Sequence, residues 1–229
     1  MHFTVLVVDI HNEGYDNLLE PFASDIYPDK EIYFPKDVAI EELKLKGDWV
    51  YEGVPDSMID EYERQLWDIF HLEVDENLNA INRFNSRAKW DWFVVGGRWQ
   101  GTMPLKDGTF EDWAKIKDVD FSGDNKKYNK ALRFWEVFVD EEELKDGEDP
   151  EDFKTYMSKV HFLSAYKTKE NYAKAYSSFS TYALLIEDDW IEVDDFENTM
   201  EYRKEFKRRI DEVLKNYPEA EVTLIDCHM

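Results

Sequence analysis

"HFTVLVVDI", residues 2–10, is the stretch that decides the fold. A nearly continuous run of apolar and β-branched residues is typical of a central strand that is buried on both faces. The sequence closes with a second such run, "EVTLIDCHM" at residues 221–229. The two runs are candidates for neighbouring strands, and His2 comes close to residues 226–228 only if they pair antiparallel.

The first half of the chain carries one strong helical pattern. Apolar residues recur at helical spacing between residues 59 and 70, with Asp56 or Ser57 as the N-cap. A second helical piece is expected at about residues 75–84. Residues 13–53 mix Pro, Gly, Asp and aromatic residues without a clear period, so we expect loops with short elements there.

The second half predicts a hairpin and several helices. "FSTYALLIEDDWIEV" at 179–193 is typical of two strands that flank residues 187–189. "ALRFWEVFV" at 131–139 fits either a strand or a helix. Helix starts are indicated by Asp149 before Pro150, by Thr168, and by the apolar stripe that runs from Thr199 to Pro218.

These elements predict a single α+β domain over residues 1–229. Its sheet is expected to be mixed or antiparallel, with helices packed on one side. The sequence contains no internal repeat and no Ser/Gly-rich linker that would mark a boundary. The acidic region at about residues 109–178 looks like an insert, and its boundaries are open.

The net charge is the outlier of the composition. The chain has 28 basic and 52 acidic residues, which give −24. Such a field repels nucleic acids and anionic membranes, and it attracts a basic surface on another protein. The alternative interpretation is that the charge only keeps the protein soluble.

Targeting and oligomerisation are constrained more weakly. The chain has one cysteine, Cys227, so no intramolecular disulfide can form. We find no secretory signal and no apolar run of the ~20 residues that span a bilayer. A cytoplasmic monomer or small oligomer is therefore expected.

The most unusual segment is "KWDWFVVGGRWQG" at residues 89–101. Apolar and other residues alternate through it, as period two requires, so it predicts two strands that meet at or near Gly96 and Gly97. The glycines allow a hairpin turn or bulge with positive φ. "KDG" at 106–108 predicts another turn.

The same segment offers a ligand site. Its glycines allow a close backbone approach, Arg98 has a donor fork for phosphate or carboxylate, and its tryptophans can stack on a base. The alternative is a hairpin whose tryptophans fill the core and whose Arg98 pairs with Asp91. The segment lacks a Walker ending and a dinucleotide fingerprint. The candidate ligand residues are Trp90, Trp92, Gly96, Gly97, Arg98 and Trp99.

Catalytic candidates lie mainly at the two ends of the chain. They are His2, Asp91, Cys227 and His228. Neighbouring strand residues point to opposite faces, so Cys227 and His228 cannot form a dyad with each other. The five histidines do not have zinc-ligand spacing, so neither a metal nor a cofactor is expected.

Two acidic runs, at 140–152 and 187–197, are candidates for a partner-binding surface. Carboxylates held on a rigid surface can imitate a phosphate backbone and occupy a basic groove. The alternative is a solvated face. The residues of this surface are Asp140, Glu141, Glu142, Glu143, Asp146, Glu148, Asp149, Asp188, Asp189, Asp194 and Asp195.

Three segments together carry a family resemblance. "HFTVLV", "KWDWFVVGGRW" and the closing "DCH" resemble a family of uncharacterised proteins from bacteriophages and related mobile elements. The resemblance implies action on a host protein in the host cytoplasm. It carries over no activity and no catalytic residue.

Three functions follow as hypotheses. The first is a stoichiometric inhibitor that mimics nucleic acid and binds a host nucleic-acid-binding or anti-phage defence complex, such as CRISPR or restriction machinery. The second is an enzyme or a nucleotide-binding or small-ligand-binding protein that uses the KWDW–GGRW and DCH motifs. The third is a structural or assembly protein.

Overall fold

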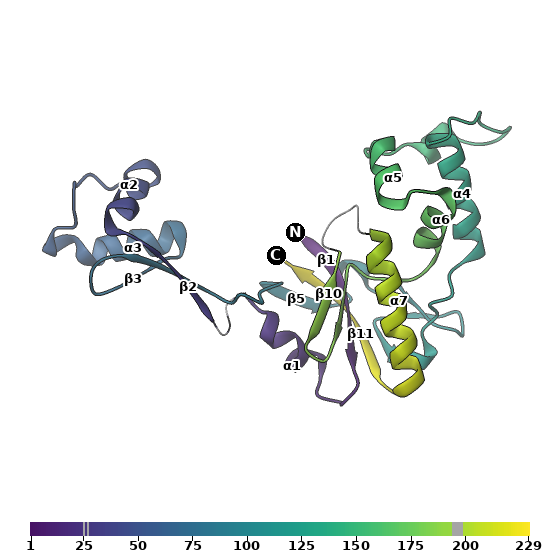
Figure 1. Cartoon of the computed structure of the whole chain (residues 1–229), viewed down its shortest axis with the longest axis horizontal. Helices are drawn as coiled ribbons and strands as arrows, with labels where there is room; N and C mark the ends of the chain where they lie inside the picture. Colours follow the sequence, from purple (N-terminus) through teal and green to yellow (C-terminus); the bar gives the residue numbers. More distant parts are fainter. Residues whose placement is uncertain (25, 27, 194–198) are drawn as a thin grey trace. The chain divides into compact units, whose positions relative to one another are not determined.

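The strand β1 (His2–Asp9) lies in the middle of the main sheet, as its apolar run predicts. This computed structural model describes the chain except for residues 25, 27 and 194–198. β1 pairs antiparallel with β11 (Glu221–His228) and parallel with β9 (Ala183–Ile186), so the sheet is mixed (Figure 1). The strand order is β10–β9–β1–β11–β5, and β8 also pairs with β11. The remaining strands are β5 (Trp92–Val95), β8 (Trp113–Lys115) and β10 (Asp189–Glu192).

The chain divides into two compact units. One comprises residues 1–19 and 92–229 and contains the main sheet, and the other comprises residues 20–91. Both combine helices with strands, so the predicted α+β class is confirmed. The single-domain organisation stays a prediction. The region 109–178 belongs to the larger unit, where β8 joins the main sheet through β11.

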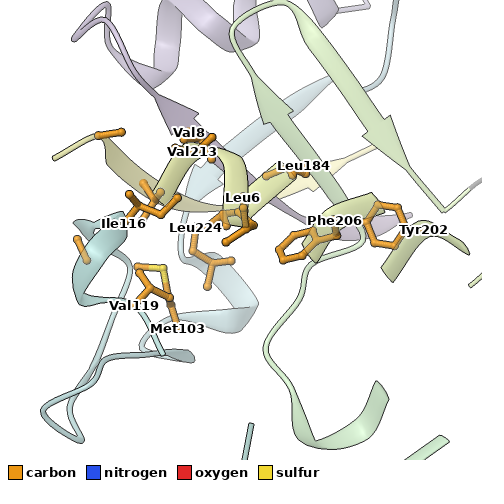
Figure 2. Close-up of a cluster of buried hydrophobic side chains, with 14 residues drawn as sticks. Leu6, Val8, Met103, Ile116, Val119, Leu184, Tyr202, Phe206, Val213 and Leu224 are labelled. Carbon is orange, nitrogen blue, oxygen red and sulfur yellow. The ribbon is translucent and has the colours of Figure 1, made fainter. Parts of the chain in front are cut away.

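The core of the larger unit lies between the sheet and α7 (Thr199–Asn216). Leu6 and Leu224, from the paired strands β1 and β11, pack in one cluster with Phe206 and Ile210 of the helix. Figure 2 shows Leu6, Leu224 and Phe206 in this cluster. Side chains alternate along a strand, so every second residue of β1 and β11 lies on the α7 face of the sheet, including the residues beyond the core. At the far end of β1 and β11 these residues are polar.

The helices of the region 109–178 begin at side-chain caps. α4 (Asn125–Phe138), α5 (Lys159–Tyr166) and α6 (Lys169–Ser177) are capped by Asp124, Ser158 and Thr168. They pack together beside α7 (Figure 1). The Thr168 cap, the hairpin and α7 therefore match the sequence, and of the two alternatives for 131–139 the structure shows the helix, as part of α4. Asp149 and Pro150 start only the short turn η5 (Pro150–Phe153), because the backbone is extended at Lys154. The next helix, α5, begins only at Lys159.

The smaller unit has a three-stranded antiparallel sheet and two helices. Its order is β2–β4–β3, and Tyr62 and Leu66 of α3 lie in its core. Two short elements, α1 and η1, follow β1 in sequence, and the boundary between the two units lies between them. The bounds are α1 (Tyr15–Leu19), η1 (Glu20–Phe22), β2 (Lys30–Phe34), α2 (Lys36–Lys46), η2 (Asp56–Met58), α3 (Ile59–Phe70), β3 (Glu73–Val74) and β4 (Ala80–Phe84).

Three expectations for this part of the chain are wrong. The predicted helix at 75–84 is a turn and β4, because Asp75 accepts the backbone N–H groups of Asn77 and Asn79 and Leu78 has a φ of 64°. α2 is a full helix where loops were expected. The N-cap of α3 is Met58, because residues 56–58 form a 3-10 turn.

Candidate functional site

The glycine pair after β5 turns the chain away from the sheet. β5 pairs with β11, and Gly96 and Gly97 have φ values of 68° and 51° and lead into η3 (Gly97–Trp99). The prediction that two strands meet at or near Gly96 and Gly97 is wrong, since β11 supplies the partner of β5. β6 (Met103–Pro104) instead pairs with β7 (Phe110–Glu111) around the predicted turn at 106–108.

The two glycines also let carboxylates approach the backbone. A Cβ added at Gly97 would meet the Asp226 side chain closer than 3.0 Å, and one at Gly96 would meet Asp112 in the same way. Asp226 Oδ2 accepts the backbone N–H of Arg98 at 3.0 Å. The glycine pair therefore positions Asp226 as well as turning the chain.

Four side chains meet where β1, β11 and β5 end or begin. The register places His2 opposite His228, and His228 opposite Trp92. Asp226 precedes His228 by two residues and so shares its face of the sheet. We call His2, Trp92, Asp226 and His228 the strand-end cluster. The two terminal strands are neighbours and pair antiparallel, which is the condition under which His2 was expected to approach residues 226–228.

The central contact of the strand-end cluster joins His2 to Asp226. His2 Nδ1 lies 2.9 Å from Asp226 Oδ1, and Asp226 is 1% exposed. An ionised carboxylate only accepts hydrogen bonds, so the proton of a neutral His2 lies on Nδ1 and the lone pair lies on Nε2. His2 is thus held in the tautomer that a general base requires.

Aromatic rings surround His2 on this face. Its ring lies 4.8 Å from the His228 ring and 5.1 Å from Trp92, both edge-on. Trp92 and His228 stack at 5.2 Å, and Trp92 is 45% exposed. His228 Nε2 lies 3.3 Å from the Met1 amino group. The cluster therefore combines titratable nitrogens with an exposed indole surface.

Cys227 lies on the opposite face of β11. It is buried beside its register partners Phe3 and Phe93. Burial, and next the charge of Asp226, raise the pKa of the thiol to about 12. A thiol with this pKa is protonated at neutral pH, so Cys227 is not suited to act as a nucleophile.

The other candidates from residues 89–101 are distributed over both units. Trp90 and Asp91 belong to the smaller unit, where Trp90 is buried. Trp99 is partly buried against the core of the larger unit. Arg98 is exposed, and within the described part of the chain its guanidinium has no ion pair. The tryptophans therefore do not pack into one core.

The first acidic run folds around one arginine. Arg133 Nε and Nη2 donate to the two carboxylate oxygens of Glu148 at 2.9 Å each, and Nη1 donates to Glu142 at 3.0 Å. The Arg133 guanidinium, and next the backbone N–H of Lys145, lower the pKa of Glu148 to about 2. Glu141 pairs with Lys159. These carboxylates organise the loop itself.

Other residues of the proposed acidic surface also have local roles. Asp140 accepts from Trp135 Nε1 at 3.2 Å, and Asp149 caps η5. Asp189 pairs with Arg209. Glu143 and Asp146 are exposed and enter no ion pair with a described residue. Asp188 is exposed, and Asp194 and Asp195 lie outside the described residues.

Sequence patterns missed the partner of His2 and the stacking of Trp92 on His228. Strand alternation from His228 to Asp226 was the available signal for both. No group of three or more His, Cys, Asp or Glu side chains in the described residues is arranged to hold a metal ion. Among those residues there is also no helix with the length and apolar character that a bilayer crossing needs. Comparisons with protein-family models, curated proteins and solved structures give no match for this chain.

Proposed function

We propose that the protein binds and chemically transforms a small ligand at the strand-end cluster, with His2 as the general acid–base. The observation that carries this proposal is the 2.9 Å contact between His2 Nδ1 and the buried carboxylate of Asp226. A carboxylate in this position fixes the imidazole and stabilises its protonated form. His2 Nε2 then accepts a proton from the ligand and returns it later in the reaction.

The ligand class follows from the groups beside His2. Trp92 presents an exposed indole that is stacked on His228 on one side. Arg98 adjoins Asp226 through its backbone N–H, and its exposed guanidinium has no ion pair in the described chain. An indole surface and a guanidinium suit a planar ring that carries an anionic group. We therefore propose a nucleotide or a similar ring-bearing anion.

A ligand panel tests the proposal. The melting temperature of the protein is measured with mononucleotides and dinucleotides, since a ligand that binds the folded state raises it. Chromatography of the same mixtures detects turnover. We expect at least one nucleotide to stabilise the wild type, and H2Q and D226N to lose turnover.

The matched control is H11Q. His11 is exposed and pairs with Glu187 at 2.8 Å, away from the strand-end register. H11Q is expected to keep the wild-type response. An unchanged melting temperature across the whole panel, or equal turnover in H2Q and wild type, would contradict the proposal.

A net charge of −24 favours a second candidate, the nucleic-acid-mimicking inhibitor. In the described acidic loop, Glu143 and Asp146 are two exposed carboxylates that have no ion pair with a described residue and cap no helix, so they are suitable test residues. A host-lysate pull-down at low salt is expected to recover a basic, nucleic-acid-binding protein, and E143Q/D146N to recover less. Recovery of no such protein would remove this candidate.

A further inference from the structure

The larger unit contains a cavity whose charged lining residues are mainly basic, although the protein as a whole is strongly acidic. A cavity of about 220 Å³ lies between α6, α7 and the segment before β9. Among the described residues that line it, four are basic and one, Asp211, is acidic, and Asp211 pairs with Lys207 at 2.7 Å. We call this the basic cavity. Its basic residues are Lys174, Arg203, Lys204 and Lys207.

Arg203 is the distinctive member of the basic cavity. It is partly buried, and its only polar side-chain contact with a described residue is Nη1 to Ser178 Oγ at 3.5 Å. Burial lowers the pKa of its guanidinium. A guanidinium removed from water without a carboxylate is unfavourable unless another acceptor binds it.

Other arginines of this chain show the contrast. With 52 acidic residues available, several arginines pair with carboxylates at close range. Lys174 and Lys204 of the basic cavity also have no ion pair in the described chain. Three basic side chains without an ion pair in the described chain therefore share this cavity. The carboxylate-paired arginines include Arg64, Arg83, Arg133, Arg208 and Arg209.

The rest of the lining defines the size and character of a ligand. Hydroxyl groups of Ser178 and Ser180 accompany the basic residues, and the rings of Phe121, Phe179 and Phe206 form an apolar wall. A neighbouring cavity of about 610 Å³ shares several of these residues and adds Lys106, Asp120 and Asp124. The space is sufficient for a small molecule that extends from the basic cavity into its neighbour.

We propose that the basic cavity binds the phosphate group of a small phosphate monoester. Arg203 and Ser178 donate to the phosphate oxygens, and Lys174 and Lys204 supply further positive charge. The ester's organic part contacts the phenylalanine wall. A nucleic-acid polymer is not the ligand, because the net charge of −24 repels a long polyanion whereas one small anion is attracted by the local field.

Isothermal titration calorimetry and melting curves with phenyl phosphate and inorganic phosphate test this proposal, with phenol as the uncharged control. We expect phenyl phosphate to bind more tightly than inorganic phosphate, and phenol not to bind. K174Q/K204Q is expected to weaken binding about tenfold or more, because two charged donors are lost. These lysines are exposed, so the variant is expected to fold normally.

K215Q is the matched control. Lys215 lies in the last turn of α7, is exposed and does not line the basic cavity. K215Q and H2Q are both expected to bind phenyl phosphate within about twofold of wild type. R203Q tests the partly buried arginine of the basic cavity and is expected to weaken binding of phenyl phosphate. Circular dichroism verifies that this variant folds. Absence of binding to wild type, or an equal loss in K215Q and K174Q/K204Q, overturns the proposal. Phenyl phosphate binding that K174Q/K204Q loses and H2Q keeps belongs to the basic cavity. Binding that only H2Q loses belongs to the strand-end cluster and overturns the present proposal, so the two proposals fail separately.

Discussion

Asp226 and Arg203 are two charged residues removed from water in the same unit, and their surroundings differ. Asp226 accepts hydrogen bonds from His2 and from the Arg98 backbone, and the glycine pair is shaped around it. Arg203 has one long contact to a serine hydroxyl among the described residues. The carboxylate is satisfied within the protein, whereas the guanidinium retains unused donors.

The difference teaches how to distinguish two kinds of site. A satisfied carboxylate orients a neighbouring group, so the strand-end cluster is preorganised before any ligand arrives. An unsatisfied guanidinium is a recognition element that a ligand completes.

Replacing Gly97 by Ala has the largest expected effect. The new Cβ collides with Asp226, and φ at this position is 51°, so the change is expected to lower the free energy of unfolding by about 3 kcal/mol or more. Chemical denaturation measures it. Gly101→Ala is the control, because φ there is 64° but no atom lies within 4 Å, so only about 1–2 kcal/mol is expected. Equal losses would show that the fit around Asp226 is loose.

Asp226→Ala and Arg203→Met test the two residues directly. Asp226→Ala leaves two donors without their acceptor and is expected to cost about 2–4 kcal/mol of unfolding free energy. Arg203→Met removes a charge that has no carboxylate partner in the described chain, so its stability is expected to stay within about 1 kcal/mol of wild type. Denaturation of both variants in phosphate-free buffer gives the comparison. A larger loss in Arg203→Met would mean that the arginine is structural.

Alkaline pH tests the burial of the residue next to Asp226. The folded-state pKa of Cys227 is raised to about 12, so its contribution to stability is complete below the unfolded pKa and is lost as pH rises towards 12. Wild type is expected to lose about 1–2 kcal/mol more than Cys227→Ala between pH 7 and pH 10. Comparing the two proteins cancels the contribution of the tyrosines. Parallel stability curves would show that the thiol is accessible to water.

The smallest expected effect concerns the acidic loop at residues 140–152. This loop folds around Arg133, which is paired with carboxylates, in contrast to Arg203. Because the folded-state pKa of Glu148 is lowered to about 2, its pairing with Arg133 is complete above the unfolded pKa and is lost as pH falls towards 2. Hydrogen exchange of the loop amides, corrected for the intrinsic pH dependence, is expected to be slow at pH 5 and faster at pH 3. Glu148→Gln is expected to exchange faster at both pH values and to show little further pH dependence. Loop protection in wild type that is unchanged at pH 3 would contradict this role of the ion pair.

The centre of the sheet could be predicted from the sequence because it depends on strong apolar runs, whereas the approach of His2 to residues 226–228 depended on a strand direction that those runs do not specify. Alternation in "KWDWFVVGGRWQG" correctly indicated a strand and glycines with positive φ. It gave the wrong partner for that strand, since alternation specifies faces and not neighbours. The true partner, β11, is far away in the sequence.

The basic cavity could not be predicted from sequence patterns. Arg203 follows the buried Tyr202 on α7 and precedes the exposed Lys204, so its position in the sequence resembles that of a surface residue. Its burial depends on α6 and on the segment before β9, which pack there only in the folded chain. Local periodicity does not contain this information.

The register of β1 has a consequence for biosynthesis. This strand is translated first within residues 1–229, yet its two neighbours, β9 and β11, both follow residue 182. A nascent chain therefore carries β1 with both edges unpaired until β9 has left the ribosome, and with one edge unpaired until β11 follows. Pairing of β1 with β11 closes a long loop, which slows the assembly of the main sheet.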